Sequence, residues 1–171
     1  NRHVNRARQQ LAAGKKEHPF FLVWGAVGPG SRSLDDAELF ELALEQYDQT
    51  TLARVEKAEP FWAILGDLEA LLLWQNSGLV PEDRIRTWQA RLRPSIEANV
   101  RIINDDSSWI SRAANTLLQS ATVLQLAVAS YGRSDPDDPD LPRWEAQALD
   151  NLARARAIQL PGGAFSYIRN S

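Results

Sequence analysis

Three observations predict an all-α protein built from antiparallel helical hairpins. Segments with a helical spacing of apolar residues follow one another along most of the chain. The turns between them are mostly short, so helices adjacent in sequence should pack antiparallel. Amphipathic segments alternate with segments that are apolar almost all round, which is the pattern of a two-layer ring with amphipathic helices outside and apolar helices inside.

The first 33 residues are predicted to form a lead-in to this helical domain. A short helix is expected to end at Gly14, and the stretch HPFFLVWGAVGPGSRS that follows suits a short strand or a packed loop. Ser33 is the expected N-cap of an amphipathic helix over 34–57, since acidic residues follow it in the first turn. Residues 34–171 then make up the domain.

Two prolines mark the starts of the next helices. Pro60 opens a segment over 60–76 whose apolar residues cover nearly the whole circumference. Pro81 opens an amphipathic helix over 81–103. Pro94 lies inside that second helix and should kink or break it, because proline lacks the N–H that the helix needs.

The last two helices are predicted over 107–131 and 143–158, joined by the acidic loop RSDPDDPDLP. The first of them is apolar almost all round but carries one polar row. Its members follow at steps of three and four residues, so they share a face: Ser108, Arg112, Asn115, Gln119 and Thr122. Such a row on an enclosed helix should face a cavity, a hydrogen-bonded partner or solvent.

Composition excludes several classes of protein. The formal net charge of -3 argues against a general nucleic-acid binder. No apolar run has membrane-spanning length, and no secretory signal is visible. The chain contains neither Cys nor Met, which removes thiol chemistry and indicates that Asn1 is not the natural start. The abrupt end after PGGAFSYIRNS likewise suggests a fragment of a longer protein.

The polar row is the strongest candidate site in the sequence. Asn115 and Gln119 offer amides to a carboxylate or a sugar hydroxyl, and Arg112 could pair with an anion. Their alternative role is to bond neighbouring helices or to face solvent. Trp109 is the best candidate for a sugar-stacking platform, whereas the other helical tryptophans are expected in the core: Trp62, Trp74, Trp88 and Trp144.

Other chemistry-bearing residues are better explained as ordinary surface. His3 and His18 lie outside the strong helices, and no known catalytic motif surrounds them. The loop acids suggest calcium, but their spacing is not that of an EF-hand, so a solvated acidic loop is expected: Asp135, Asp137, Asp138 and Asp140. No metal site and no cofactor are expected.

The alternating hairpins, the helix WISRAANTLLQSATVLQLA and the turn LPGGAFSYIRN resemble the (α/α) toroid of polysaccharide lyases of the alginate lyase and heparinase II/III-like group. The resemblance covers most of the chain from about residue 34. It implies a secreted or periplasmic enzyme that cleaves a uronic-acid polysaccharide by β-elimination, with further toroid helices and a β-sandwich beyond this segment.

The resemblance also implies roles for residues. Asn115 would neutralise the substrate carboxylate, and Tyr167 would be the candidate for proton transfer. Substrate binding would fall to Trp109, Arg112, Gln119, Arg169 and Asn170. No His follows Asn115, so this segment has no evident base of that type.

Two other functions remain open. A glycoside hydrolase on a similar ring needs two carboxylates across a cleft, and Asp67 and Glu69 are the obvious acids on an inner helix. A non-catalytic all-α interaction domain needs only the polar row as a seam with a partner. Products with a double bond would indicate a lyase, and binding of a partner helix without any response to oligosaccharides would indicate the interaction domain.

Overall fold

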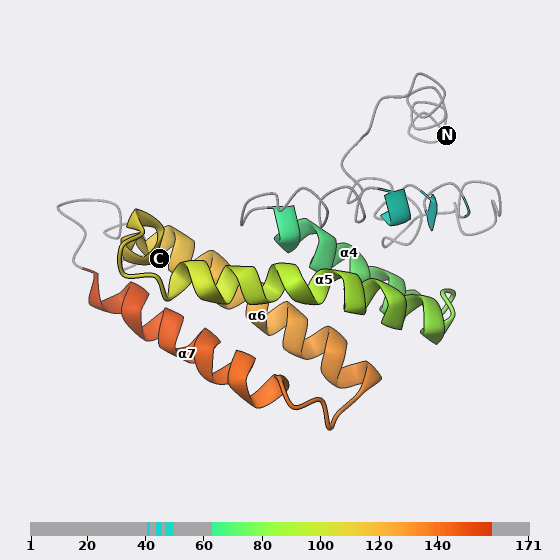
Figure 1. The fold of residues 1–171 in the computed structure, drawn as a ribbon. Helices are drawn as coiled ribbons and strands as arrows, with labels where there is room; N and C mark the ends of the chain where they lie inside the picture. Colours follow the sequence, from blue (N-terminus) through green and yellow to red (C-terminus); the bar gives the residue numbers. More distant parts are fainter. Residues whose placement is uncertain (1–40, 42–43, 46, 50–62, 159–171) are drawn as a thin grey trace, which may run out of the picture.

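The computed structural model describes residues 41, 44–45, 47–49 and 63–158, and it is all-α within these ranges (Figure 1). Four α-helices and one short 3-10 helix follow in order, as α4 (Ala63–Ser77), α5 (Glu82–Ile103), η2 (Trp109–Arg112), α6 (Ala114–Ser134) and α7 (Leu141–Ala157). The described residues between 41 and 49 are helical, in agreement with the helix predicted over 34–57. The segments 1–33 and 159–171, including the predicted first helix and the strand or loop after it, lie outside the described residues.

The helices form two antiparallel hairpins, α4–α5 and α6–α7, so the predicted all-α class and antiparallel packing are confirmed. Helix α6 contacts α4, α5 and α7, which makes it the central helix (Figure 1). Its neighbour α7 packs mainly on α6. No described helix is both long enough and apolar enough to cross a bilayer.

Helix α4 is enclosed as predicted. Every residue from Ile64 to Gln75 is buried or half-buried, so no face of these three turns is fully exposed. Its Trp74 packs near Trp88 of α5, with ring centroids 6.4 Å apart, and Tyr47 contacts Trp88 at 4.6 Å. This aromatic group anchors the first hairpin, and it confirms the expected core positions of Trp74 and Trp88.

Helix α5 runs through Pro94 as one element, so the predicted break is wrong. Proline removes one backbone hydrogen bond, yet a buried stripe continues on both sides of it. Trp88, Leu92 and Ile96 are fully buried along this stripe. Their burial holds the two halves of the helix on the same core, and Pro94 itself lies on the exposed side.

The predicted helix over 107–131 begins too early. Residues Trp109–Arg112 form η2, and Ala113 is extended with φ −97° and ψ 119°, so α6 starts only at Ala114. Side chains in this stretch bond the nearby backbone, which competes with helix formation. Asp105 accepts from the N–H and hydroxyl of Ser107 at 2.9 and 2.6 Å, and Ser111 Oγ donates to the carbonyl of Ser108 at 2.8 Å.

The other end of α6 lies at Ser134, three residues beyond the predicted end at residue 131. Gly132 lies inside α6, where it leaves room for α7. A Cβ at this position would lie 3.3 Å from Leu141 Cδ1, which is a tight contact. Helix α7 begins at Leu141 and shows the predicted amphipathic pattern. Its buried residues follow at steps of four, three and four: Trp144, Ala148, Asn151 and Ala155.

Candidate functional site

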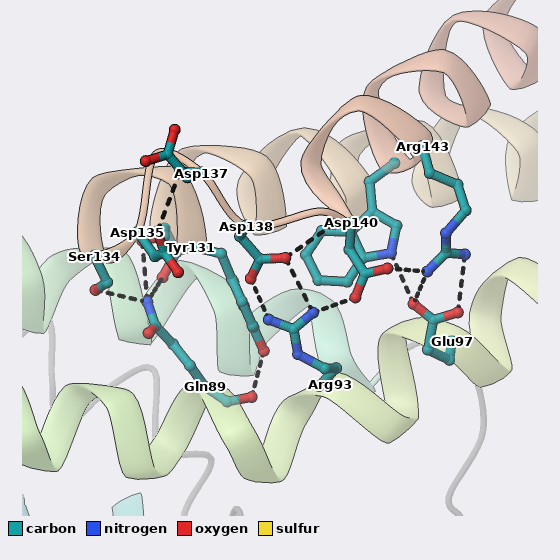
Figure 2. Close-up of polar contacts among 12 residues, drawn as sticks. Gln89, Arg93, Glu97, Tyr131, Ser134, Asp135, Asp137, Asp138, Asp140 and Arg143 are labelled. Carbon is teal, nitrogen blue, oxygen red and sulfur yellow. Dashed lines mark hydrogen bonds and ion pairs between the residues drawn. The ribbon is translucent and has the colours of Figure 1, made fainter.

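A group of linked ion pairs lies where the loop 135–140 meets α5 (Figure 2). Arg93 of α5 forms ion pairs with both Asp138 and Asp140 of this loop. Arg143, at the start of α7, bonds Asp140 at 2.7 Å and Glu97 of α5 at 2.6 Å. We call these five alternating charges the arginine clamp.

The Arg93 guanidinium lies against two aromatic rings. Its central carbon lies 4.9 Å from the centroid of Tyr131 and 5.1 Å from that of Trp144. The two rings are themselves in edge contact at 5.1 Å. Trp144 Nε1 donates to Glu97 at 2.9 Å, and the Tyr131 hydroxyl donates to the carbonyl of Gln89. Every group of this stack therefore has a partner, and Trp144 is in the core as predicted.

The charges shift the pKa values of the clamp in a consistent way. The hydrogen bonds from Arg93 lower the pKa of Asp138, and those from Arg143 lower the pKa of Glu97. The same bonds raise the pKa of each arginine. Burial raises the pKa of the Tyr131 hydroxyl, so this phenol stays protonated near neutral pH. Near neutral pH the carboxyl groups of Asp138 and Glu97 are thus held in the charged form and the Tyr131 hydroxyl in the protonated form, so none of these three groups is poised to exchange a proton.

These contacts correct the interpretation of the loop acids as simply solvated. Asp138 is only 8 % exposed, and Asp140 is half-buried against the same arginine. Their carboxylates are bound by the guanidinium groups of Arg93 and Arg143. Asp135 and Asp137 remain exposed. Within the described ranges, no cluster of His, Asp and Glu could hold a metal ion.

Two open hollows lie beside α5. One, of about 190 Å³, is bordered by the clamp and by Gln89 and Ser134. The other, of about 500 Å³, is bordered by Asp48, Arg84 and Arg91. Arg84 forms an ion pair with Asp48 at 2.5 Å, and Arg91 approaches the same carboxylate at 3.7 Å. The two arginines of this hollow thus share one acidic partner, while Arg93 in the first hollow pairs with Asp138.

The residues of the predicted polar row are divided by the break at Ala113. Asn115, Gln119 and Thr122 share one face of α6, whereas Ser108 and Arg112 precede the helix. Asn115 and Thr122 are exposed, and Gln119 is half-buried. Arg112 is exposed and donates to the carbonyl of Asp106 at 2.9 Å. None of these residues borders either hollow.

The remaining candidates fall in two groups. The side chain of Trp109 and all of Tyr167, Arg169 and Asn170 lie outside the described residues. Asp67 and Glu69 are two residues apart on α4, so their side chains leave the helix in nearly opposite directions. Asp67 is buried and Glu69 half-buried, and they do not face each other across a cleft as a hydrolase pair would.

Before Arg133, the exposed face of α6 carries no charged side chain. Between Arg112 and Arg133 the chain has no charged residue, although 24% of all residues are charged. The face consists of the exposed Asn115, Thr122, Gln125 and Ala129 with the half-buried Leu118, Gln119 and Leu126. We call these seven residues the neutral face. They lie within an arc of roughly 120° on the helix.

The exposed sides of the flanking helices are charged in the usual manner. Helix α7 exposes Arg143, Glu145, Asp150 and Arg156. Helix α5 exposes Glu82, Asp83, Arg86 and Arg101. Among the described helices the neutral face is thus specific to α6, and the gap in the charge pattern from 113 to 132 was the sequence feature that could have revealed it.

Fold and surface together define this part of the chain as an all-α domain of two antiparallel hairpins with a charge-free face on its central helix. Comparison with protein-family models, with curated proteins and with solved structures finds no match to this chain.

Proposed function

We propose that this chain is a non-catalytic all-α interaction domain that binds a helical partner through the neutral face of α6. The observation that supports it is the absence of charge over residues 113–132, on a helix whose Asn115, Thr122, Gln125 and Ala129 are exposed. An exposed helix face that stays in water usually carries charges, as α5 and α7 do. A face that is covered by a partner avoids them, because a buried charge without a counter-charge is costly.

The same reasoning defines the chemistry of the partner. A charged partner surface would find no counter-charge between Arg112 and Arg133 and would lose its hydration on binding. Amides, hydroxyls and small apolar side chains match the neutral face better. The partner is therefore a helix surface with uncharged polar residues, alanine and leucine.

Site-specific cross-linking tests this proposal. A photoreactive benzoylphenylalanine at Thr122 should form an adduct in cells that make the chain, and mass spectrometry should place the contact in an uncharged helical peptide. The same group at Ala153, which is exposed on α7, is the matched control. Adducts at both positions alike, or a highly charged contact peptide at Thr122, would overturn the proposal.

A second candidate is the polysaccharide lyase that the sequence resembles, with the hairpins as part of an (α/α) toroid. It is favoured by the exposure of Asn115, whose amide can donate to a uronate carboxylate. It requires the partner to be an acidic polysaccharide, yet such a chain carries repeated carboxylates and the rest of the face has no cation to meet them. For this reason we rank the lyase below the interaction domain as a candidate function.

The enzyme assay for this candidate is specific. A lyase produces an unsaturated uronate, which absorbs in the ultraviolet, and Asn115→Ala in the complete protein should abolish that product. A lyase that keeps its activity in the variant would exclude the role of Asn115, and the absence of product from the unaltered protein on uronate polysaccharides would favour the interaction domain.

A further inference from the structure

The residues of the neutral face are arranged with a symmetry of their own. On either side of Thr122, the neutral face contains the residues that lie three, four and seven positions away in the sequence. The residue types repeat in mirror order, with glutamine at both third positions and leucine at both fourth positions. The pairs are Gln119 with Gln125 and Leu118 with Leu126, while Asn115 and Ala129 occupy the outer positions.

We infer that the partner of the neutral face is α6 of a second copy of this chain, packed antiparallel about a two-fold axis at Thr122. This inference rests on the proposed function and names its partner. A two-fold interface uses the same patch on both copies, so residue i meets residue j and residue j meets residue i. The mirror order of the neutral face satisfies this condition, so two copies can pair without using a second surface patch.

The individual contacts agree with such a pair. Leu118 of each copy meets Leu126 of the other, which buries apolar area on both sides of the axis. Gln119 meets Gln125, and each amide has a donor and an acceptor, so the two can bond each other reciprocally. Thr122 meets its own copy at the axis. Its hydroxyl donates to the carbonyl of Leu118 at 3.0 Å, so the donor of each Thr122 is satisfied within its own helix.

The charges nearest this pairing lie at the two ends of the helix. In the same register Arg112 lies opposite Gly132, so Arg112 is only one residue, about 1.5 Å, along the axis from Arg133 of the other copy. Arg112 donates within its own copy to the carbonyl of Asp106 at 2.9 Å. Arg133 is also engaged within its own copy, where it donates to Asn76 at 2.6 Å.

The register can be tested by disulfide cross-linking, because the chain has no cysteine of its own. Thr122→Cys should form a covalent dimer under mild oxidation, since a disulfide needs Cα atoms within about 7 Å. Asn115→Cys alone should not, because its two copies would lie roughly 21 Å apart along the axis at 1.5 Å per residue. Asn115→Cys mixed with Ala129→Cys should cross-link again. Ala153→Cys on α7 is the control and should stay monomeric.

Sedimentation equilibrium supplies an independent measurement. The unmodified protein should show a concentration-dependent mass that approaches twice the 19.1 kDa of the chain. Thr122→Arg should reduce the association constant at least tenfold, because it places two like charges at the axis, and Ala153→Arg should not. Circular dichroism of both variants verifies that each exposed substitution leaves the fold intact.

The outcomes separate this inference from the proposed function. A protein that remains monomeric at its highest soluble concentration overturns the self-association, as does a covalent dimer of Asn115→Cys alone. If photocross-linking at Thr122 still captures a different uncharged helix in that case, the interaction domain stands with another partner. If Thr122 forms no adduct either, both proposals fail.

Discussion

Arg93 is the residue on which the second hairpin depends most. It joins α5 to the loop before α7 through two carboxylates, and its guanidinium lies against the rings of Tyr131 and Trp144. Removing one partner of a buried ion pair costs more than the pair contributes, because the other charge stays desolvated. Here the charge left behind is the buried Asp138.

Arg93→Met is therefore expected to destabilise the protein by about 2 kcal/mol, less than for a fully buried pair because Arg93 is half-exposed. Urea unfolding followed by circular dichroism measures this change. Arg86→Met is the matched control, since Arg86 lies on the same helix, is exposed and donates only to the carbonyl of Ser134 and to nearby Glu82. Equal losses in the two variants would contradict the clamp.

The clamp also predicts how stability depends on pH. Arg93 holds the pKa of Asp138 below its ordinary value, and Arg143 does the same for Glu97. A carboxylate with a lowered folded pKa contributes stability that is complete above its unfolded pKa and is lost as the pH falls through the folded pKa. The protein should thus lose stability below about pH 4, where such carboxylates begin to protonate.

Asp138→Asn should weaken this acid dependence, while Asp137→Asn should leave it unchanged. Figure 2 shows the carboxylate of Asp137 directed away from the arginines, so it is a suitable control in the same loop. Urea midpoints measured from neutral pH to about pH 2 give the comparison. An unchanged pH profile in Asp138→Asn would show that Arg93 does not stabilise the charged form.

Ser120 links three helices through a chain of side-chain hydrogen bonds. Its hydroxyl donates to Asn99 of α5 at 2.6 Å and accepts from Asn151 of α7 at 3.0 Å, and all three residues are buried. Ser120→Ala leaves both asparagines short of a partner, so a loss of about 2 kcal/mol is expected. Thr87→Ala removes an exposed hydroxyl that bonds its own helix and should cost much less. The free energies of unfolding of the two variants decide this comparison.

At the scale of the elements, α5 shows how burial outweighs a local defect. Pro94 removes one backbone hydrogen bond, but the buried stripe from Trp88 to Ile96 keeps the helix continuous. Pro94→Ala should therefore raise the stability by roughly 1 kcal/mol, because it restores the missing donor at an exposed position and improves helix propensity. Thermal unfolding measures the shift, and a lower melting temperature would indicate that the proline is needed where it stands.

The helices themselves were largely predictable because their information is local. The steps between Trp144, Ala148, Asn151 and Ala155 appear in the sequence, and the structure buries these same residues. The start of α6 was not predictable from periodicity, since hydrogen bonds of Ser107 and Ser111 with nearby groups displace the helix there. Helical spacing identifies residues that share a face of a helix, but it does not show whether that face is exposed to solvent.

The arginine clamp could not be predicted from the sequence, because it is formed by residues that lie far apart along the chain. Arg93 and Asp138 are 45 residues apart, and no local sequence pattern around either residue indicates that the two form an ion pair. The acidic loop with its prolines was therefore interpreted as solvated. Only the docking of the second hairpin on α5 brings the two groups together, so this part of the site could not be predicted.

At the scale of the whole molecule, α6 is the helix through which the others are connected. It contacts α4, α5 and α7, and Ala121, Leu124 and Ala127 are almost completely buried along it. Opening of this helix exposes the core of both hairpins at once. Its central amides should thus exchange hydrogen most slowly, close to the rate set by global unfolding. Hydrogen exchange by mass spectrometry tests this order, and faster exchange in α6 than in α7 would contradict it.

The arginine clamp has a consequence for proteolysis. Exposed loops with aspartate and proline at the molecular surface are ordinarily the places where a protease cuts first. In this protein Arg93 and Arg143 tie the segment 135–140 to α5 at two carboxylates, so it cannot adopt the extended form that a protease requires. The loop that looks most open to cleavage in the sequence should resist it, and cleavage there would report that the two hairpins have separated.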